Sequence, residues 1–438
     1  MNQLKDAGSL IHSGNSTRYP FVAQDRVNSL FGHQIHCVLR LVGFVDMELL
    51  VQAYRVTLDI EPVLGCRLAE ENQEWFWERR ADLDMLNGVS IHETDDVETQ
   101  LKAFICAPSD ARVDPLISIR VFRSTYDLIC VKCNHACCDA GGVKDYISLL
   151  SSTYNHLSSS PNSPPTVPNK GRRDQGIVFD QLGYHNLLEA WDASEAQPIA
   201  KWAFPFDPST EQKLWTSTYR FQPECYRSFQ TFNHLHGVSF NDLLLTAYYR
   251  ALFSITRSYG AGPMPLPVTM DLRQHLPNGK AKAICNLSSS MNIEIEVLEH
   301  EPFLDTLMKV NRQTKKAKNP RLGVNGMVTL ETLAALNYEE LKKTFHMSME
   351  EGIKSKKSNP ILSNVGIISD QPIFFSDVEV IDAYIAGPIM MPPGFLLLIS
   401  SYNQNLTLST GYDASSVKEE HVELLLRTMS SELILAVS

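Results

Sequence analysis

The segment Val131–Gly142, VKCNHACCDAGG, constrains the fold of this chain more than any other stretch. Its apolar, strand-like residues end at His135, and Asp139 and two glycines follow at once. Apolar residues at helical spacing begin directly afterwards, so the pattern predicts a strand, a tight turn and then a helix. An imidazole held at the end of a strand is a candidate general base, because an unperturbed histidine titrates near neutral pH.

Length and composition limit the class of protein. A chain of 438 residues predicts two or three domains, and 44% hydrophobic with 20% charged residues is typical of a folded globular protein. The net charge of −11 argues against a nucleic-acid partner, which would require a basic face. The longest apolar run, residues 394–399, is too short for a transmembrane segment. The nine cysteines lack the spacing of a disulfide framework, and the first ten residues lack an apolar signal core, so we expect a cytoplasmic protein.

A proline- and serine-rich stretch from Ser158 to Arg173 predicts an exposed linker. We therefore expect an N-terminal unit over residues 1–157, a linker over 158–175 and a C-terminal unit over 176–438. Strand and helix signals alternate in both units, which predicts an α/β fold. Strands are expected at 36–44, 63–68, 74–79, 115–122, 128–133, 266–270, 288–297, 361–368, 374–385, 394–402 and 406–412. Helices are expected after Asp46, Asp139, Ser239 and Ser416 and near 303–313 and 331–345.

His135 and Asp139 are four residues apart, a spacing that would place them on one face of a helix. The flanking residues instead place them across a turn, so Asp139 is expected to point inward, and Gly141 allows the chain to turn. An inward carboxylate needs a cationic partner, since an unpaired buried charge is very unfavourable. The residues alone leave open that His135 is a buried histidine bonded to its own loop.

The cysteines near His135 suggest two other hypotheses. Cys133, Cys137 and Cys138 could join His135 around zinc, but adjacent cysteines do not easily supply two corners of a tetrahedron and no second ligand pair follows, so no metal is expected. Cys137 or Cys138 could be a nucleophile, although no sequence feature marks either thiol as activated. Packing as small buried residues is the simplest interpretation of the cysteines.

The run Asn134–Gly141 resembles the HxxxD motif of the CoA-dependent acyltransferase superfamily, which includes chloramphenicol acetyltransferase, BAHD-type alcohol acyltransferases and condensation domains of nonribosomal peptide synthetases. Gly43–Asp46, an amphipathic helix and Glu61–Arg67 resemble the opening strand, helix and turn of that superfamily. Val268–Arg273 resembles its strand ending in arginine, and Cys285–Asn286 the pair that follows. The resemblance covers nearly the whole chain. It implies two chloramphenicol-acetyltransferase-like subdomains, each a mixed sheet with helices, in a V-shaped pseudodimer.

The resemblance also implies roles for individual residues. His135 would be the general base, Asp139 and Arg273 a structural ion pair, and Ser363 the donor to the oxyanion. The residues implied to bind substrate are Asn134, Gly141, Asn286 and Asn364. Ser363 fits a strand start or turn equally well, and Asn286 could line the channel or bond local backbone. No permanently bound cofactor is implied; an acyl-CoA or phosphopantetheine thioester would be the co-substrate.

The chain departs from the superfamily at three places. Asn134 stands where condensation domains carry a first histidine, Ala140 follows Asp139 in place of glycine, and the DFGWG motif of plant enzymes is absent. We expect a stand-alone acyltransferase that moves an acyl group from a CoA or carrier-protein thioester to a small alcohol or amine. A free-standing condensation enzyme and a non-catalytic binding protein are the alternatives. Lysine runs at 280–282, 315–318 and 354–357 could bind CoA phosphates but are more typical of solvated surfaces.

Overall fold

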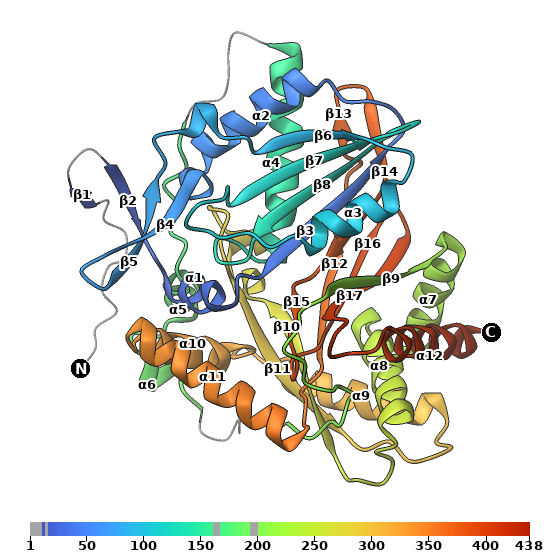
Figure 1. Ribbon diagram of the computed structural model, residues 1–438. Coiled ribbons are helices and arrows are strands. Elements are labelled where there is room, and N and C mark those ends of the chain that lie inside the picture. Colours follow the sequence, from blue (N-terminus) through green and yellow to red (C-terminus); the bar gives the residue numbers. More distant parts are fainter. Residues whose placement is uncertain (1–10, 14–15, 161–166, 193–199) are drawn as a thin grey trace.

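The structure is a computed structural model that describes residues 11–13, 16–160, 167–192 and 200–438 (Figure 1). Two large mixed sheets, each with its own helices, confirm the predicted α/β fold with two subdomains. The first sheet has the spatial order β13 (Phe374–Phe375), β14 (Val378–Ala386), β3 (Gln34–Leu41), β8 (Asp127–Asn134), β7 (Ile117–Arg123) and β6 (Val89–Glu93). The second has the order β11 (Ser288–Ile295), β10 (Met264–Asp271), β12 (Ile361–Ile367), β16 (Leu396–Tyr402), β17 (Asn405–Asp413) and β15 (Ile389–Met390), with β9 (Leu214–Phe221) also paired to β17.

Helices cover both faces of the first sheet. Alternate residues of β3 explain this arrangement, because Cys37 and Leu39 enter the core beneath α2 (Met47–Ile60) and α4 (Ala140–Ser159). Val38 points the other way, into a smaller core beneath α3 (Val97–Cys106). A strand that is buried on both faces has a nearly continuous run of apolar residues in its sequence. This run is why residues 36–44 could be predicted to form a strand.

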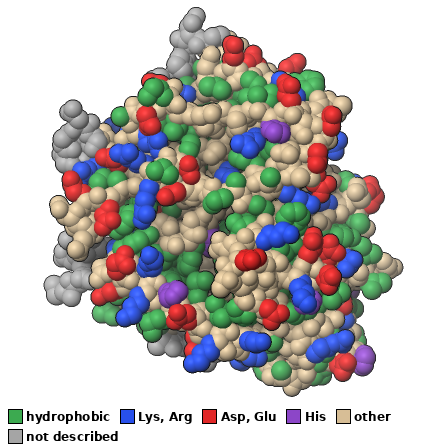
Figure 2. Space-filling model, viewed as in Figure 1, with side chains coloured by type: hydrophobic (Ala, Val, Ile, Leu, Met, Phe, Trp, Pro, Cys, Tyr) green, Lys and Arg blue, Asp and Glu red, His purple; other side chains and the backbone are tan. Residues whose placement is uncertain are grey.

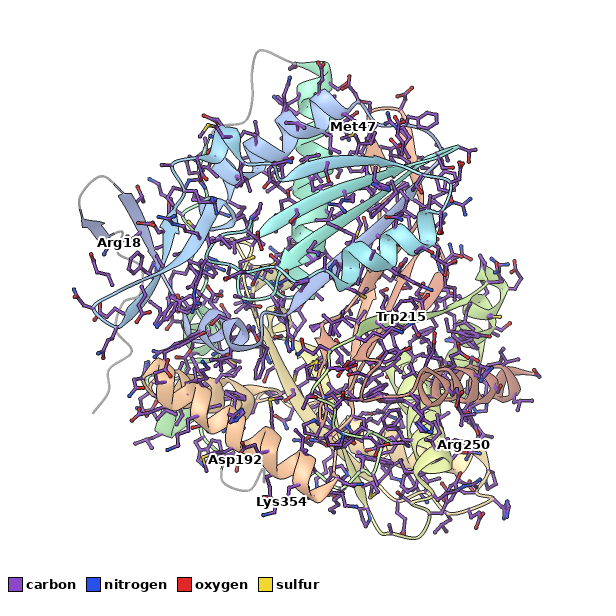
Figure 3. The ribbon with its side chains drawn as sticks, viewed as in Figure 1. Arg18, Met47, Asp192, Trp215, Arg250 and Lys354 are labelled. Carbon is purple, nitrogen blue, oxygen red and sulfur yellow. The ribbon has the colours of Figure 1, made fainter. Side chains whose placement is uncertain are left out.

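The second subdomain packs helices α7 (Pro223–His236), α8 (Phe240–Thr256), α9 (Phe303–Ala317) and α12 (Glu419–Val437) against its sheet. The predicted capping box is present: the Ser239 hydroxyl accepts from Asp242 N, and the Asp242 carboxylate accepts from Ser239 N. That carboxylate also accepts hydrogen bonds from Asn311 and Thr314 of α9, so the cap joins two helices. Arg250 of α8 pairs with Glu432 of α12 on the outer side (Figure 3).

The remaining elements are short or peripheral. They are β1 (Ile11–Ser13), β2 (Ser16–Pro20), β4 (Cys66–Glu71) and β5 (Glu74–Arg79) in a small sheet, helices α1 (Ala23–Asn28), α5 (Gly176–Leu182), α6 (Leu187–Ala190), α10 (Val324–Ala334) and α11 (Tyr338–Ser355), and 3₁₀ turns at Ser29–Phe31, Pro62–Gly65, Leu83–Met85, Leu272–His275 and Pro277–Gly279. The helix predicted near 331–345 is divided between two helices, because α10 ends at Ala334 and Asn337 caps α11. The predicted strand over 63–68 begins as a 3₁₀ turn and becomes a strand only at Cys66.

The C-terminal part of the chain contributes two strands, β13 and β14, to the first sheet. β14 follows the second-subdomain strand β12 along the chain, yet it lies antiparallel to β3 of the first sheet, with Ala386 opposite His36 and Val380 opposite Leu41 (Figure 1). A second contact joins α3 to β9, where the Lys102 ammonium lies 5.5 Å from the ring centre of Trp215 (Figure 3). The contiguous boundaries expected from the sequence assign both strands to the C-terminal unit.

The end of the predicted linker is packed between the subdomains. Within residues 167–175, which we call the strap, Gln175 is buried and only 9% of the Arg173 side chain is exposed. The Asn169 amide binds Glu61 of the first subdomain and the Lys282 carbonyl of the second. Val167, Pro168, Lys170 and Arg172 are exposed, as predicted for a linker, whereas Gln175 and the side chain of Arg173 are not. Residues 161–166 lie outside the described residues.

The described residues form no helix that is long and apolar enough to cross a membrane. On the face shown in Figure 2, lysine and arginine side chains are interspersed with aspartate and glutamate, and neither sign forms a continuous patch. This mixed charge is typical of a solvated protein surface.

Because strands from the C-terminal part of the chain complete the first sheet, we predict that the two subdomains unfold together. Trp77 is buried in the first core and Trp202 in the second, so Trp77→Phe and Trp202→Phe each remove the buried tryptophan of one subdomain and raise the share of the fluorescence that comes from the other. We expect both variants to give coincident urea transitions by fluorescence and circular dichroism, as a single cooperative unit should. Separate midpoints for the two signals within one variant would contradict this expectation.

Glu61 predicts a pH dependence of stability. Burial raises its pKa to about 7, against the hydrogen bonds from Asn169 and from Ile284 N. The folded chain therefore binds more protons than the unfolded chain between the ordinary glutamate value, ~4.3, and about 7. Stability from this group is complete below that window and is lost as the pH rises through it. In urea titrations, we expect the unfolding free energy of Glu61→Gln to fall less than that of the parent chain as the pH rises from 5 to 8. Equal decreases would contradict a raised pKa of Glu61.

Candidate active site

The residues His135–Asp139, which we call the histidine turn, connect the end of β8 to the start of α4. The Asn134 side-chain oxygen accepts from Ala136 N at 3.0 Å, and the Asn134 carbonyl accepts from Cys137 N at 3.0 Å. Asp139 is the N-cap of α4 and accepts from Gly142 N at 2.8 Å. The sequence therefore turns within five residues because a short polar side chain closes each end.

His135 faces a cavity of about 210 Å³ at the junction of the two sheets. Its backbone N–H donates to the His33 carbonyl at 2.9 Å, which fixes the residue against the start of β3. The ring Nδ1 is buried without a hydrogen-bond partner among the described residues, so Nε2 is the nitrogen that remains for chemistry in the cavity. The cavity is lined from the first subdomain by Ile35, His135, Asp139, Ala140, Gly141 and Lys144 and from the second by Thr269, Met270, Asp271, Ser288, Ser363, Asn364, Val365, Pro388, Leu396 and Leu398.

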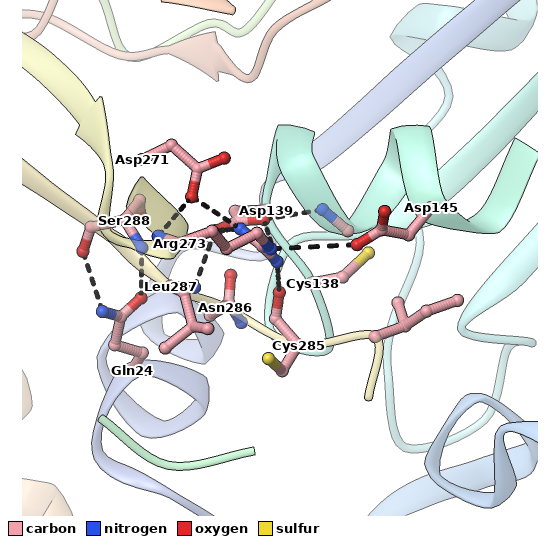
Figure 4. A network of polar contacts seen from close by, with 12 residues as sticks. Gln24, Cys138, Asp139, Asp145, Asp271, Arg273, Cys285, Asn286, Leu287 and Ser288 are labelled. Carbon is pink, nitrogen blue, oxygen red and sulfur yellow. Dashed lines mark hydrogen bonds and ion pairs between the residues drawn. The ribbon is translucent and has the colours of Figure 1, made fainter. Parts of the chain in front are cut away.

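The structure brings Arg273 to Asp139 (Figure 4). Arg273 Nη2 lies 3.0 Å from Asp139 Oδ1, and Nη1 donates to Oδ2 at 3.1 Å. Arg273 also donates to the Cys285 carbonyl at 2.8 Å and to Asp271 at 3.1 Å. Asp139 Oδ2 accepts in addition from Leu287 N at 2.7 Å. The carboxylate is thus turned away from His135 and joins α4 to the second subdomain.

This pairing fixes the charges at the site. Burial alone would raise the pKa of Asp139, but the charge of Arg273 and the hydrogen bonds from Arg273, Gly142 N and Leu287 N hold it below its usual range. Burial opposes the charge on Arg273, yet Asp139 and Asp271 raise its pKa above the ordinary value. Asp139 is therefore ionised near neutral pH and holds no proton to transfer.

Glycine is required at positions 141 and 142 because neighbouring atoms lie too close for a side chain, and not because of the backbone dihedral angles. A Cβ atom on Gly141 would lie 2.5 Å from Arg273 Nη1, and one on Gly142 would lie 3.0 Å from the Cys285 carbonyl oxygen. Gly141 also lines the cavity. The two glycines let α4 begin directly against the second subdomain, with Ala140 taking the place of glycine one residue earlier.

Ser363 and Asn364 lie on the opposite wall of the cavity, on β12. The Thr269 hydroxyl donates to Ser363 Oγ at 2.8 Å, which leaves the Ser363 proton free to donate into the cavity. Asn364 binds Asn241 and Gly366 N, where the pairing of β12 with β16 shifts register. Their substrate contacts stay a prediction.

Asn134 and Asn286 occupy positions different from those expected for substrate contacts. Asn134 is buried and its side-chain oxygen closes the histidine turn. Asn286 is also buried, and its amide donates to the carbonyls of His135 and Ala136 at 3.0 Å each. Neither side chain lines the cavity around His135. Asn286 therefore forms hydrogen bonds to backbone carbonyls, which was one of the two roles considered from the sequence.

All nine cysteines are free thiols, and Cys133, Cys137 and Cys138 are fully buried in the first core. The Cys137 thiol donates to the Asn134 carbonyl. Among the described residues, no three His, Cys, Asp or Glu side chains are grouped as they would be around a metal ion.

Sequence reasoning missed several residues at the site. Lys144 of α4 lines the cavity and donates to the Val365 and Ile367 carbonyls of β12, so it also joins the subdomains. Arg173 of the strap donates to the Cys137 carbonyl at 2.6 Å. Helical spacing placed Lys144 on α4, but no local signal marks the side of the helix that meets β12.

A larger cavity of about 910 Å³ lies on the other side of β3. His33, Gln34 and His36 line it, whereas Ile35 points into the cavity around His135. Neighbouring residues of the segment 388–390 also line different cavities. Pro388 lines the small cavity, and Ile389 and Met390 line the large one. The alternation of β3 therefore separates the two cavities. His33, which lines the large cavity, accepts a hydrogen bond from the backbone N–H of His135, which lines the small one.

The chain shares its fold with solved structures of an acetyltransferase, a polyketide synthase associated protein and a condensation domain. The TRI3 trichothecene 15-O-acetyltransferase from Fusarium sporotrichioides superposes with a TM-score of 0.73 at 12% identity, over 98% of this chain and 97% of the other. Polyketide synthase associated protein 5 from Mycobacterium tuberculosis gives 0.67 at 16% identity, over 95% and 98%.

The first condensation domain of the calcium-dependent antibiotic synthetase gives a TM-score of 0.66 at 13% identity, over 96% of this chain and 97% of that domain. No protein-family profile matches the chain, and no curated protein matches its sequence. At these identities the likeness establishes the fold, and both acetyltransferases and condensation domains share it.

The close approach at Gly141 predicts that Gly141→Ala is destabilising. The new methyl group would overlap Arg273, which cannot withdraw without breaking its bonds to Asp139 and the Cys285 carbonyl. We expect a loss of ~1–3 kcal/mol of unfolding free energy in urea, as for other overpacked sites. Gly43→Ala is the matched control, because its Cβ would make an ordinary 3.6 Å contact with Val378. Equal stability of the two variants would show that the fit at Gly141 is not tight.

Proposed function

We propose that this chain is an acyltransferase that moves an acyl group from a CoA or carrier-protein thioester to an alcohol or amine, with His135 as the general base. The observation that carries the proposal is the state of the groups lining the small cavity. Asp139 is bound to Arg273, Asp271 is bound to Arg273, and Lys144 is bound to two carbonyls of β12. Among the ionisable side chains of the described lining, His135 alone has no such partner.

The proposed reaction uses Nε2 of His135. It takes the proton of the acceptor hydroxyl or amine as the acceptor oxygen or nitrogen bonds to the thioester carbonyl carbon. The carbonyl oxygen becomes an oxyanion, and the Ser363 hydroxyl, which already accepts from Thr269, is the proposed donor to it. Collapse breaks the carbon–sulfur bond, and the proton on His135 passes to the departing thiolate. The products are the ester or amide and a free thiol.

Asp139 has no part in proton transfer in this proposal. Its carboxylate is bound by Arg273, Gly142 N and Leu287 N, and its depressed pKa keeps it ionised near neutral pH. Its proposed contribution is to hold the N-terminus of α4, and with it the histidine turn, at a fixed distance from Ser363. Loss of this buried pair should therefore affect folding as well as activity.

The cavities suggest where the substrates lie. The space around His135, about 210 Å³, suits the reacting ends of two substrates but not a whole CoA. The cavity of about 910 Å³ beyond His33 and Ile389 would receive the bulk of one substrate. A further cavity of about 410 Å³ shares Asn364 with the small one and is lined by Tyr226 and Phe240, which gives the other substrate a second approach. This supports a reaction between substrates that enter from two sides.

A condensation enzyme that joins carrier-bound substrates is the second candidate. The condensation domain of the calcium-dependent antibiotic synthetase has the same fold over nearly its full length, and a carrier-bound donor presents the same phosphopantetheine arm as CoA. The two candidates share the chemistry at His135 and differ in what carries the acyl group.

Thioester turnover tests the proposal. Purified protein is offered acyl-CoAs and acyl-phosphopantetheinyl carrier proteins with a panel of alcohols and amines, and release of free thiol is followed. We expect turnover with at least one pair and a loss of ~10²–10⁴-fold in His135→Ala, the usual contribution of a general base.

The Ser363→Ala variant should lower kcat without abolishing turnover, since it removes one oxyanion donor. Urea transitions of both variants control for folding. Equal turnover by the parent chain and His135→Ala, with both folded, would rule out His135 as the base, and activity only with carrier-bound donors would favour the condensation enzyme.

A further inference from the structure

Arg173 of the strap uses all three of its side-chain nitrogens at the subdomain junction. Nη1 lies 2.5 Å from Asp25 Oδ2, Nη2 donates to the Cys137 carbonyl at 2.6 Å, and Nε donates to the Ile284 carbonyl at 3.2 Å. One planar guanidinium thus contacts α1, the histidine turn and the second subdomain together. Its planar geometry with several donors suits this arrangement in a way that a lysine ammonium does not.

Asp25 anchors this arginine from the first subdomain. The carboxylate is fully buried on α1 and accepts from Trp77 Nε1 at 2.8 Å and from the Asn286 amide at 3.1 Å, besides Arg173. Its neighbour Gln24 bonds Gln175 of the strap. A buried carboxylate with this many donors is held in one position, and it holds its partners in turn.

The same network reaches three consecutive carbonyls of the histidine turn. Asn286, which is tied to Asp25, donates to the carbonyls of His135 and Ala136, and Arg173 donates to that of Cys137. The Arg273–Asp139 pair fixes only the far end of the turn, at the start of α4. The N–H groups of this backbone are held by His33 and Asn134. Its carbonyl groups are held by the contacts around Asp25 and Arg173.

We propose that Arg173 and Asp25 form a second brace that positions the His135 imidazole, so that the strap is part of the active-site architecture. The brace acts through the backbone of residues 135–137 and touches no substrate. In its catalytic consequence the inference rests on the proposed function, whereas the position of the imidazole is measurable without any substrate.

Arg173→Lys separates positioning from general stability. The ammonium can still pair with Asp25, but it cannot reach the carbonyls of both Cys137 and Ile284. Arg123→Lys is the matched control, because Arg123 also pairs with a buried aspartate, Asp127, and donates to a backbone carbonyl, that of Val45. These partners lie at the start of β8 and in the loop before α2, with no bond to the histidine turn.

The primary measurement is the ring ¹⁵N chemical shift of His135 in the full chain labelled with ¹⁵N-histidine, assigned by the signal lost in His135→Gln. We expect the His135 signal to move in Arg173→Lys and to stay in place in Arg123→Lys. Where turnover is established, kcat of Arg173→Lys should fall ~10–100-fold with KM changed by less than about twofold, because misplacement of a catalytic group lowers the rate more than binding.

A purely structural role would lower the urea midpoint of Arg173→Lys while leaving the His135 signal of its folded form unchanged, and that result would overturn the proposal. If Arg173→Lys does not fold, Asp25→Asn serves instead, since it keeps the shape of the anchor and removes its charge; an unmoved His135 signal there would likewise overturn the proposal. Absence of turnover in the parent chain contradicts the proposed function but leaves the ¹⁵N measurement decisive for the brace.

Discussion

The burial of the Asp139 carboxylate at the subdomain junction is the interaction on which the site depends. An ionised carboxylate in such a place must be paired and hydrogen-bonded, and here the cation and one N–H come from the second subdomain, at Arg273 and Leu287. The pairing therefore fixes how the two sheets meet. It also explains why a side chain at Gly141 should be destabilising, since the guanidinium lies 2.5 Å from the position of a Cβ atom there.

Three other parts of the chain also connect the two subdomains at this junction. β14 belongs to the second half of the chain yet completes the first sheet, the strap lies between the subdomains, and Lys144 crosses from α4 to β12. The cavity wall is shared, with His135 on one side and Ser363 on the other. Neither subdomain contains both walls of this cavity, so the proposed acyl transfer would require the assembled pair.

The elements that were predictable from sequence carry strong local signals. Asp46 and Ser239 cap α2 and α8 as expected, because capping depends on residues within one turn. The helix α3 and the strand β9 were not foreseen. In β9 the residues from Leu214 to Phe221 are mostly half-buried or exposed at one edge of its sheet, and their apolar pattern is correspondingly weak.

The residues of the site also differ in whether a local sequence signal marks them. His135, Asp139, Arg273 and Ser363 were identified through the resemblance of local motifs, and the structure brings them to one junction. Asp25 and Arg173 are 148 residues apart and belong to no motif that was recognised. Proline and serine predicted exposure for the whole segment 158–173, yet the burial of Arg173 depends on a carboxylate far away in sequence. Composition reports local preference and contains no information on such a partner.

The distribution of charge around His135 limits the kind of substrate that can react there. Every charged group of the described cavity lining is already engaged by a protein partner, so the wall offers no free cation for a phosphate or carboxylate near the base. In the proposed reaction, the reacting ends of both substrates should therefore be uncharged, as a thioester and a hydroxyl are, and the charged parts of the proposed donor should lie outside this cavity. The small volume leads to the same conclusion, because about 210 Å³ accommodates the atoms that exchange bonds and little more.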